Sequence, residues 1–196
     1  MCIRDRGTKC CIETRELLEN AGIKTVGIGK NSAEAATVLY INQKEKGTLA
    51  IVNCCEHEFS IATATTAGAN PLNPIQQYYN IQEARTKADY VLVIVHGGHE
   101  HYALPSPRMK ETYRFFIDAG ADAIINHHQH CYSGYEIYTE NLFSMAWEIC
   151  FSIIKANVTV LGTKVTWYRF DSTNRHYLNS NYTRIHNATN DLPLYR

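Results

Sequence analysis

The stretch YVLVIVHGGHEHYALPSPRMKETYRFFIDAGADAIINHHQH, residues 90–130, decides the fold. It begins with a short apolar and β-branched run, residues 90–95, which is typical of a strand covered on both faces. A helical pattern and a second apolar run, residues 121–125, follow it. Six of the chain's nine histidines lie in this stretch, next to the ends of the two runs. They are His96, His99, His101, His127, His128 and His130.

Residues 106–120 have the pattern of a capped amphipathic helix. Ser106 can cap the helix, Pro107 suits its first turn and Gly120 suits its end. Apolar residues recur between them at helical spacing and predict one buried face. That face consists of Met109, Tyr113, Phe116 and Ile117.

A strand–helix–strand unit of this length places its two strands parallel, with a right-handed crossover. The carboxyl ends of the strands then lie at one edge of the sheet, where open α/β sheets form ligand sites. We therefore expect His96, after the first strand, to approach His128 and His130 after the second. Neutral imidazole binds zinc, iron, nickel and copper, and binds manganese with the help of carboxylates. The two loops thus predict a metal site.

An isolated histidine more often lies on the surface or in a satisfied core position. Two histidine-bearing loops at one sheet edge favour a metal site over that alternative, because metal ligands cluster. Not all six histidines can be ligands. We expect His99 and His101 to be loop residues or to face the substrate. We expect His127 to contact the ligands without binding the metal itself.

Two segments, VIVHGGHEHYALPSPRMKE and FFIDAGADAIINHHQHCYSGYEIY, closely resemble the CapA-type capsule synthesis (poly-γ-glutamate synthesis) family, a branch of the calcineurin-like metallophosphatases. The resemblance covers roughly residues 7–138. By position, His96 matches the family's single loop histidine, and His128 and His130 match its His-x-His motif. Glu100 matches the glutamate of the first loop, where it would orient a ligand or substrate. Gly97 stands where the family usually has tryptophan.

The resemblance implies an α/β fold that forms part of a calcineurin-like metallophosphatase sandwich, with βαβ units and a mixed sheet. It implies a phosphoesterase-type hydrolase in intact relatives, with a divalent transition metal (Mn, Fe or Zn) in a two-metal site. The family's acidic ligands and its Asn-Asn-His loop precede the point where this chain joins the pattern. Three histidines without an acidic bridge make an incomplete two-metal site. We therefore expect an incomplete site here and assign no catalytic residue.

Bulk properties narrow the class of protein. The 196 residues suit one domain. The 19 basic and 19 acidic residues balance, so the chain lacks the net positive charge that is typical of nucleic-acid-binding domains. The expected partner is a small-molecule or polymer substrate. No apolar run is long enough to span a membrane. Seven cysteines without framework spacing argue against a disulfide scaffold and favour the cytoplasm for this chain, although relatives are often anchored to a membrane.

The remaining chain predicts further elements around this unit. Residues 11–20 have a helical period, residues 24–28 have the pattern of a strand, and residues 38–41 and 48–53 predict paired strands. Glu56, His57 and Glu58 follow the last of these, either as solvated groups, which we favour, or as substrate-side groups. Residues 74–88 predict a helix with one buried side. That side consists of Ile75, Tyr78, Tyr79, Ile81 and Ala84.

Both ends of the chain depart from the family pattern. Residues 1–6 are predicted to be a non-native leader, residues 7–138 the CapA-like fragment, and residues 139–196 an out-of-frame tail. Read one base earlier, permissive codons turn residues 140–150 into Gly-Lys-Pro-Ile-Phe-Tyr-Gly-Leu-Gly-Asn-Leu, which resembles the family continuation. The codons of Met145 and Trp147 force two of these glycines. An intact frame through Thr139 in the genomic locus would contradict this hypothesis.

Three hypotheses remain open for the function. The leading one is a CapA-like protein of capsule or poly-γ-glutamate synthesis, with a metal-dependent hydrolase site in intact relatives. The second is a non-catalytic polymer-binding or assembly protein with the same fold. The third is an inactive fragment. Bound metal and phosphodiesterase activity in a full-length version separate the first two.

Overall fold

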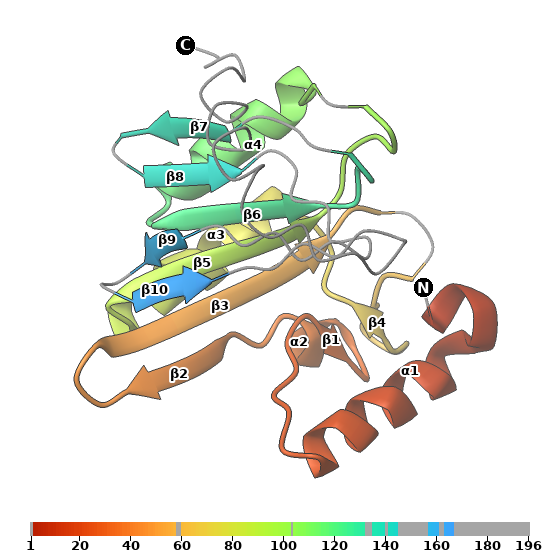
Figure 1. Ribbon diagram of the computed structural model, residues 1–196. Coiled ribbons are helices and arrows are strands. Elements are labelled where there is room, and N and C mark those ends of the chain that lie inside the picture. The colour runs from red at the N-terminus through yellow and green to blue at the C-terminus, as the bar shows by residue number, and fades with distance from the viewer. Residues whose placement is uncertain are drawn as a thin grey trace, which may run out of the picture.

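The strand–helix–strand unit predicted from the histidine-rich stretch is present in the computed structural model of the chain (Figure 1). The structure describes residues 2–57, 60–102, 104–131, 135–139, 141–144, 157–160 and 163–166. The helices are α1 (Cys2–Asn20), α2 (Ser32–Ala35), α3 (Pro74–Lys87) and α4 (Pro107–Asp118). The strands are β1 (Ile28–Gly29), β2 (Leu39–Gln43), β3 (Gly47–Cys55), β4 (Gly68–Ala69), β5 (Tyr90–His96), β6 (Ala123–His127), β7 (Tyr135–Tyr138), β8 (Asn141–Ser144), β9 (Asn157–Val160) and β10 (Thr163–Thr166).

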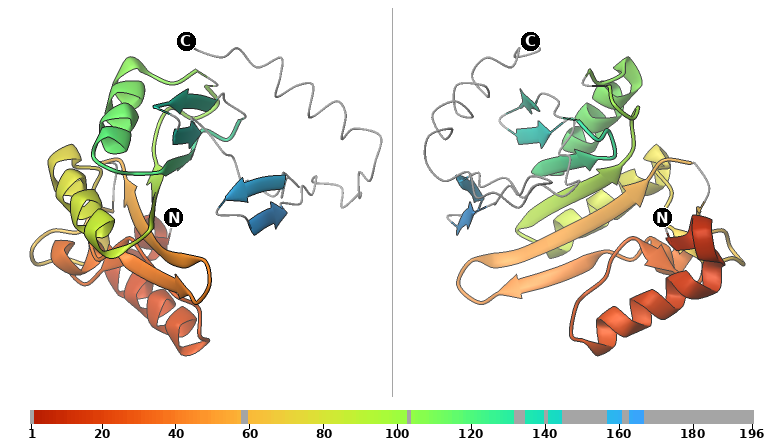
Figure 2. Two further views of the ribbon diagram at one scale, coloured as in Figure 1. Left: turned by 90° about the vertical axis from the view of Figure 1, so that its left-hand side faces the viewer. Right: turned by 45° about the vertical axis from the view of Figure 1, so that its right-hand side comes forward.

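One mixed sheet contains six of these strands, in the order β2-β3-β5-β6-β8-β7. The four central strands run parallel, and the edge strands β2 and β7 pair antiparallel with their neighbours. Helices α3 and α4 lie on the same face of this sheet, as the left view of Figure 2 shows. The expected α/β class, with βαβ units and a mixed sheet, is confirmed, and this arrangement agrees with part of a metallophosphatase-like fold.

Helix α4 has the predicted boundaries and the predicted buried face. Oγ of Ser106 accepts a hydrogen bond from the N–H of Met109 at 3.2 Å and so caps the helix. The hydroxyl of Tyr113 donates to Oδ1 of Asn126 in β6 at 2.8 Å. This bond attaches α4 to the strand one residue before His127. The apolar side chains predicted to be buried are all buried: Met109, Tyr113, Phe116 and Ile117.

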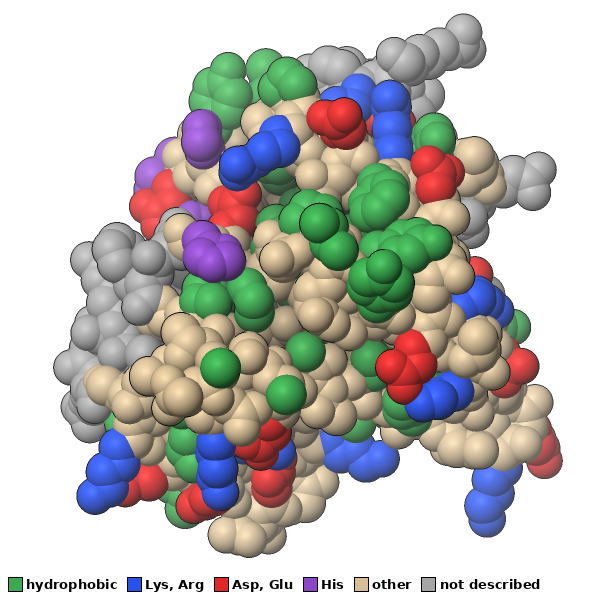
Figure 3. All heavy atoms as spheres, turned by 180° about the vertical axis from the view of Figure 1, so that it is seen from behind, with side chains coloured by type: hydrophobic (Ala, Val, Ile, Leu, Met, Phe, Trp, Pro, Cys, Tyr) green, Lys and Arg blue, Asp and Glu red, His purple; other side chains and the backbone are tan. Residues whose placement is uncertain are grey.

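Helix α3 starts at the predicted residue, but the prediction of its buried side is partly wrong. Ile81 is fully buried, whereas Ile75 and Tyr79 are 71% and 62% exposed. Phe115 of α4 is also exposed, and its ring stacks on that of Tyr78 with 5.6 Å between centroids. Figure 3, seen from behind the view of Figure 1, shows hydrophobic side chains gathered in a patch on this face of the molecule, with histidine side chains to one side of it.

Two polar side chains of α3 that the predicted buried side did not include are buried. Gln77 and Asn80 are buried, and the side-chain amide of Asn80 donates to Oε1 of Gln77 at 3.0 Å. Gln77 in turn donates to Oδ1 of buried Asn70 and to the carbonyl of Pro71. The loop before α3 thus enters the interior, and its polar groups require these hydrogen-bond partners.

Strand residues with small or β-branched side chains form the core beneath the helices. Val91, Val93 and Val95 of β5 are almost completely buried. Neighbouring strands contribute Ala50, Val52, Cys54 and Ile124 to the same core. This core fixes the parallel register, in which Cys55 pairs with His96 and His96 pairs with His127.

The N-terminal elements differ in length from their predictions. Helix α1 extends beyond residues 11–20 and contains one non-helical residue, Gly7 (φ 78°, ψ 174°). The strand predicted for residues 24–28 is wrong for most of its length. Only Ile28 enters a strand, because Gly27 takes a positive φ of 85° and turns the chain just before it. The hairpin of β2 and β3 is confirmed, with longer strands than predicted.

In the part of the chain that the structure describes, no helix has the length and apolar character needed to cross a membrane. Most of residues 139–196 lie outside the described residues, and so do Met1 and Glu58. Strands β8, β9 and β10 fall within this tail, and β9 and β10 form a separate antiparallel pair. The out-of-frame tail and the leader stay predictions.

Candidate metal centre

The carboxyl ends of β5 and β6 bring two histidines together. His96 and His127 are directly opposite in the parallel register. Their Nδ1 atoms are 3.0 Å apart, and their ring centroids are 4.6 Å apart. One ring must donate and the other accept in this contact, so at least one imidazole has its proton on Nδ1. The two histidine loops therefore start from a shared hydrogen bond.

His127 is the electrostatically distinctive member of the pair. Burial, with smaller contributions from the nearby rings of His96 and His128, lowers the pKa of His127 to about 4. The imidazole of His127 is therefore neutral near pH 7. A hydrogen bond at the second ring nitrogen orients ligating histidines in metal sites, and the contact between Nδ1 of His96 and Nδ1 of His127 occupies one ring nitrogen of His96 in this manner.

Glu100, His128 and His130 form a group that could hold a metal ion. One ligand atom from each residue lies within 4.8 Å of those from the other two. Nε2 of His130 and Oε1 of Glu100 are 3.8 Å apart. His128 lies deeper than its two exposed partners, so the group opens to solvent. Two imidazoles and one carboxylate suit manganese, iron or zinc, which fits the expected kind of metal.

His96 borders this group at the end of β5. Its ring centroid lies 4.7 Å from that of His128, and the centroid of His128 lies 6.0 Å from that of His130. His128 is therefore the common neighbour of the other two histidines that the sequence proposes as ligands. The three-residue group includes Glu100, for which the sequence predicted an orienting role, and does not include His96.

The other two histidines of the first loop lie outside the group. His101 has its ring centroid 5.8 Å from that of His130. His99 is exposed, and its carbonyl accepts a hydrogen bond from the N–H of Tyr102 at 3.3 Å. Both positions fit a loop or a substrate-side location better than a place among the ligands.

The second histidine loop has unusual backbone geometry. His128 has φ 123° and His130 has φ 53°, and His101 of the first loop has φ 57°. Side chains other than glycine seldom adopt positive φ, and values far from the left-handed helical region are strained by about 1–3 kcal/mol. Strain of this kind collects at functional sites, where the rest of the fold imposes it. It falls here on His128, which has φ 123° and is a member of the three-residue group, whereas φ 53° of His130 is close to the left-handed helical value.

Residues outside the first histidine loop hold it in place, and sequence reasoning missed their role. Oε2 of Glu56 accepts a hydrogen bond from the N–H of Gly98 at 2.9 Å, and its Oε1 lies 3.2 Å from Nη2 of Arg108. The side-chain amide of Gln129 donates to the carbonyl of Gly97 at 3.0 Å. The sequence suggested Glu56 only as a solvated or substrate-side group. The adjacent glycines were the available signal, because glycine permits close approach to the backbone.

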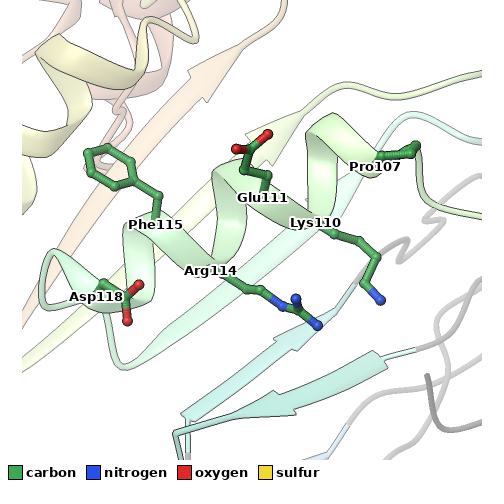
Figure 4. Close-up of a pocket in the computed structure, with 6 residues that line it drawn as sticks. All are labelled: Pro107, Lys110, Glu111, Arg114, Phe115 and Asp118. Atoms are coloured by element: carbon green, nitrogen blue, oxygen red, sulfur yellow. The ribbon is translucent and has the colours of Figure 1, made fainter. Parts of the chain in front are cut away.

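A separate open pocket of about 540 Å³ lies along α4 (Figure 4). Lys110 and Arg114 point toward the strands, and Glu111 and Phe115 point the other way. The amino group of Lys110 lies 3.3 Å from the buried carboxylate of Glu136, and Nε of Arg114 donates to the same carboxylate at 2.7 Å. The histidines of the two loops do not line this pocket, so it is distinct from the candidate metal centre. Its lining consists of Pro107, Lys110, Glu111, Arg114, Phe115 and Asp118.

Two curated proteins from Bacillus species are similar in sequence to this chain. The chain is 29% identical over 144 residues to the capsule biosynthesis protein CapA of Bacillus anthracis, and 29% identical over 137 residues to the PGA biosynthesis protein CapA of Bacillus subtilis strain 168. The matches cover 70% and 68% of this chain, but only 35% and 36% of the two relatives. The chain therefore spans about a third of the length of the curated relatives that it matches.

The family profile described as "Bacterial capsule synthesis protein PGA_cap" matches residues 3–146. This range includes the whole β3–β5–β6 core, helix α4 and both histidine loops. It extends over more than half of the 196 residues. The chain therefore belongs to the bacterial capsule synthesis protein (PGA_cap) family, the CapA-type family that its motifs resemble.

Proposed function

We propose that this chain carries the histidine-rich half of a metal-dependent hydrolase site, in a protein of capsule or poly-γ-glutamate synthesis. One observation supports this proposal most strongly. Two loops from neighbouring parallel strands bring His128, His130 and Glu100 within 4.8 Å of one another, with His96 beside them. The curated relatives are named for capsule and PGA biosynthesis, which supports the biological setting.

The residues have separate roles in this proposal. His128 and His130 hold a divalent metal (Mn, Fe or Zn), and Glu100 completes the donor set from the first loop. His96 also faces the metal, and its hydrogen bond with neutral His127 fixes the orientation of its ring. When bound, the metal supplies Lewis acidity and lowers the pKa of a coordinated water, the chemistry that phosphoester hydrolysis needs.

The site that we propose is one half of a two-metal centre. Among the residues that the structure describes, one group of three suitable side chains is found, which is enough for a single cation. The chain covers about a third of its relatives, so we propose that the full-length protein supplies the remaining acidic ligands. Its substrate is a small molecule or a polymer with phosphoester linkages.

A second function, polymer binding or assembly without catalysis, is favoured by one observation. Glu100 and His130 are exposed, and within the described residues the group provides donors for one cation only. A single exposed cation can bridge the protein to an anionic polymer without activating water. In this case the metal binds, but a full-length version has no phosphodiesterase activity.

Metal binding by the 196-residue chain tests the proposal. We expect about one Mn²⁺ or Zn²⁺ per chain by calorimetry, and a loss of affinity of about 100-fold in His128→Ala, since a first ligand matters at least as much as the outer partners of a site. His57→Ala removes an exposed histidine after β3 and serves as the matched control. Equal affinity of the His128→Ala and unsubstituted chains would sink the proposed site.

Phosphodiesterase activity separates the two functions. A full-length version is assayed with a generic phosphodiester, bis(p-nitrophenyl) phosphate, in the presence of Mn²⁺. Activity that is lost in His128→Ala supports the hydrolase. Bound metal without activity supports the binding function.

A further inference from the structure

One peptide group in the first histidine loop is held at both of its polar atoms. The carbonyl of Gly97 accepts a hydrogen bond from Nε2 of Gln129 at 3.0 Å. The N–H of Gly98, in the same peptide group, donates to Oε2 of Glu56 at 2.9 Å. Glu56 follows β3, and Gln129 lies in the second histidine loop between His128 and His130. Two separate parts of the chain therefore fix the plane of this peptide.

The space around the two glycines fits these contacts. A Cβ at Gly97 would lie 2.6 Å from Cγ of Glu56, and a Cβ at Gly98 would lie 2.3 Å from Nε2 of Gln129. Gly98 also has φ +110°, which side chains rarely allow. With the side chains of Glu56 and Gln129 in these positions, which together we call the clamp, neither glycine has room for a Cβ. A side chain at position 97, where the family pattern has tryptophan, would require Glu56 to move.

The two clamping side chains are themselves fixed. The Gln129 residue is 3% exposed, and its backbone carbonyl accepts a hydrogen bond from the N–H of His101. The backbone N–H of Glu56 donates to the carbonyl of His96 at 2.9 Å, which continues the sheet ladder beyond β3. Oε1 of Glu56 contacts Arg108, an exposed residue in the first turn of α4. The clamp is therefore attached to the sheet, to α4 and to the second loop.

We propose that Glu56 and Gln129 are positioning residues that set the distance between the two metal-binding loops. They hold the Gly97–Gly98 peptide, and this peptide places Glu100 opposite His128 and His130. Neither side chain has to touch the cation, since both act through the backbone of the first loop. The inference rests on the proposed metal site and assigns it a device that presets its geometry before metal binds.

The test uses the full 196-residue chain and Co²⁺ as the probe, with affinity measured by calorimetry and coordination by the visible absorption of the ion. Glu56→Ala and Gln129→Ala are each expected to weaken Co²⁺ binding by about 10–100-fold, the range for outer partners of metal ligands. Glu56→Gln keeps an acceptor for the N–H of Gly98 and is expected to recover most of the affinity. Glu83→Ala, which removes a glutamate from an exposed ion pair on α3, is the matched control.

Amide hydrogen exchange provides a readout that does not depend on metal. Without metal, the N–H of Gly98 is expected to exchange at least about tenfold faster in Glu56→Ala, because its acceptor is gone. Glu56→Gln should restore slow exchange. If Glu56→Ala does not fold, the Co²⁺ affinity of Gln129→Ala decides between the outcomes.

Two results would overturn the inference in different ways. If the unsubstituted chain binds Co²⁺ and both alanine variants bind it equally well, the clamp does not position the loops and the metal site stands. If the unsubstituted chain binds no Co²⁺, the proposed metal site fails and the positioning role fails with it.

Discussion

The two histidine loops leave neighbouring strands at paired residues, yet they turn in different ways. The first loop, which follows His96, turns at Gly98 with φ +110°. The second loop, which follows His127, turns at two histidines, His128 with φ 123° and His130 with φ 53°. Both loops also contain a histidine with φ near +55°, His101 and His130. The backbone angle farthest from the left-handed helical region falls on a glycine in the first loop and on His128, a proposed ligand, in the second.

This difference shows that the two halves of the site are built by different means. In the first loop, contacts from Glu56 and Gln129 determine where the backbone lies. In the second loop, the conformation is imposed on His128 itself. Substitutions in the first loop should therefore act through lost contacts and crowding, and substitutions in the second should act through relief of strain.

The largest effect is expected from Gly98→Ala. The new Cβ would lie 2.3 Å from Nε2 of Gln129 and 3.2 Å from Cε of Met109, at a backbone angle that alanine tolerates poorly. We expect a loss of about 2–4 kcal/mol in the free energy of unfolding, from backbone strain and overpacking together. Chemical denaturation followed by circular dichroism measures this change.

Gly22→Ala is the matched control for this substitution. Gly22 also has a positive φ, +79°, but a Cβ there would have nothing within 4 Å. Its substitution should cost only the backbone term, about 1–2 kcal/mol. Equal losses in the two variants would show that the clamp around Gly98 leaves room for a side chain, contrary to the comparison between the loops.

A smaller effect is expected at His128 and concerns strain alone. His128→Gly and His128→Ala both remove the imidazole, so they differ mainly in how well each residue tolerates φ 123°. The glycine variant should be more stable than the alanine variant by about 1 kcal/mol in metal-free buffer. Thermal and urea unfolding of the two variants provide the measurement. A more stable alanine variant would mean that the second loop is relaxed at this position.

The sequence predicted those parts of the molecule that depend on local patterns. The apolar runs of β5 and β6 and the cap and buried face of α4 are local features, and they suffice to make the two strands parallel. Once they are parallel, His96 and the histidines after the second run lie at one edge of the sheet. The pairing of His96 with His127 itself was not predicted, because β6 runs from Ala123 to His127 and not over residues 121–125. The edge at which the candidate site lies could therefore be found without the structure.

Other features depend on contacts between distant residues, which a pattern of side chains cannot reveal. The bond between Glu56 and Gly98 joins residues 42 positions apart. Gln77 and Asn80 on α3 are buried because Gln77 bonds the loop that enters the core before the helix, and the apolar pattern identified only Ile81 and Ala84 on that buried face. The positive φ of His128 was hidden for a related reason, since such angles are expected at glycine.

The smallest effect is expected from His99→Ala, and it tests which residues of the first loop belong to the site. His99 is exposed, and the hydrogen bond that its carbonyl accepts from the N–H of Tyr102 is retained by alanine. The free energy of unfolding should change by less than about 0.5 kcal/mol, as for ordinary surface positions, and affinity for Mn²⁺ should stay within about twofold. Glu100→Ala, one residue further, should weaken Mn²⁺ binding by about tenfold or more, as the loss of a donor requires. If His99→Ala weakens Mn²⁺ binding as much as Glu100→Ala does, His99 is a metal ligand as well. The contacts at Gly98 would then position His99 in addition to Glu100.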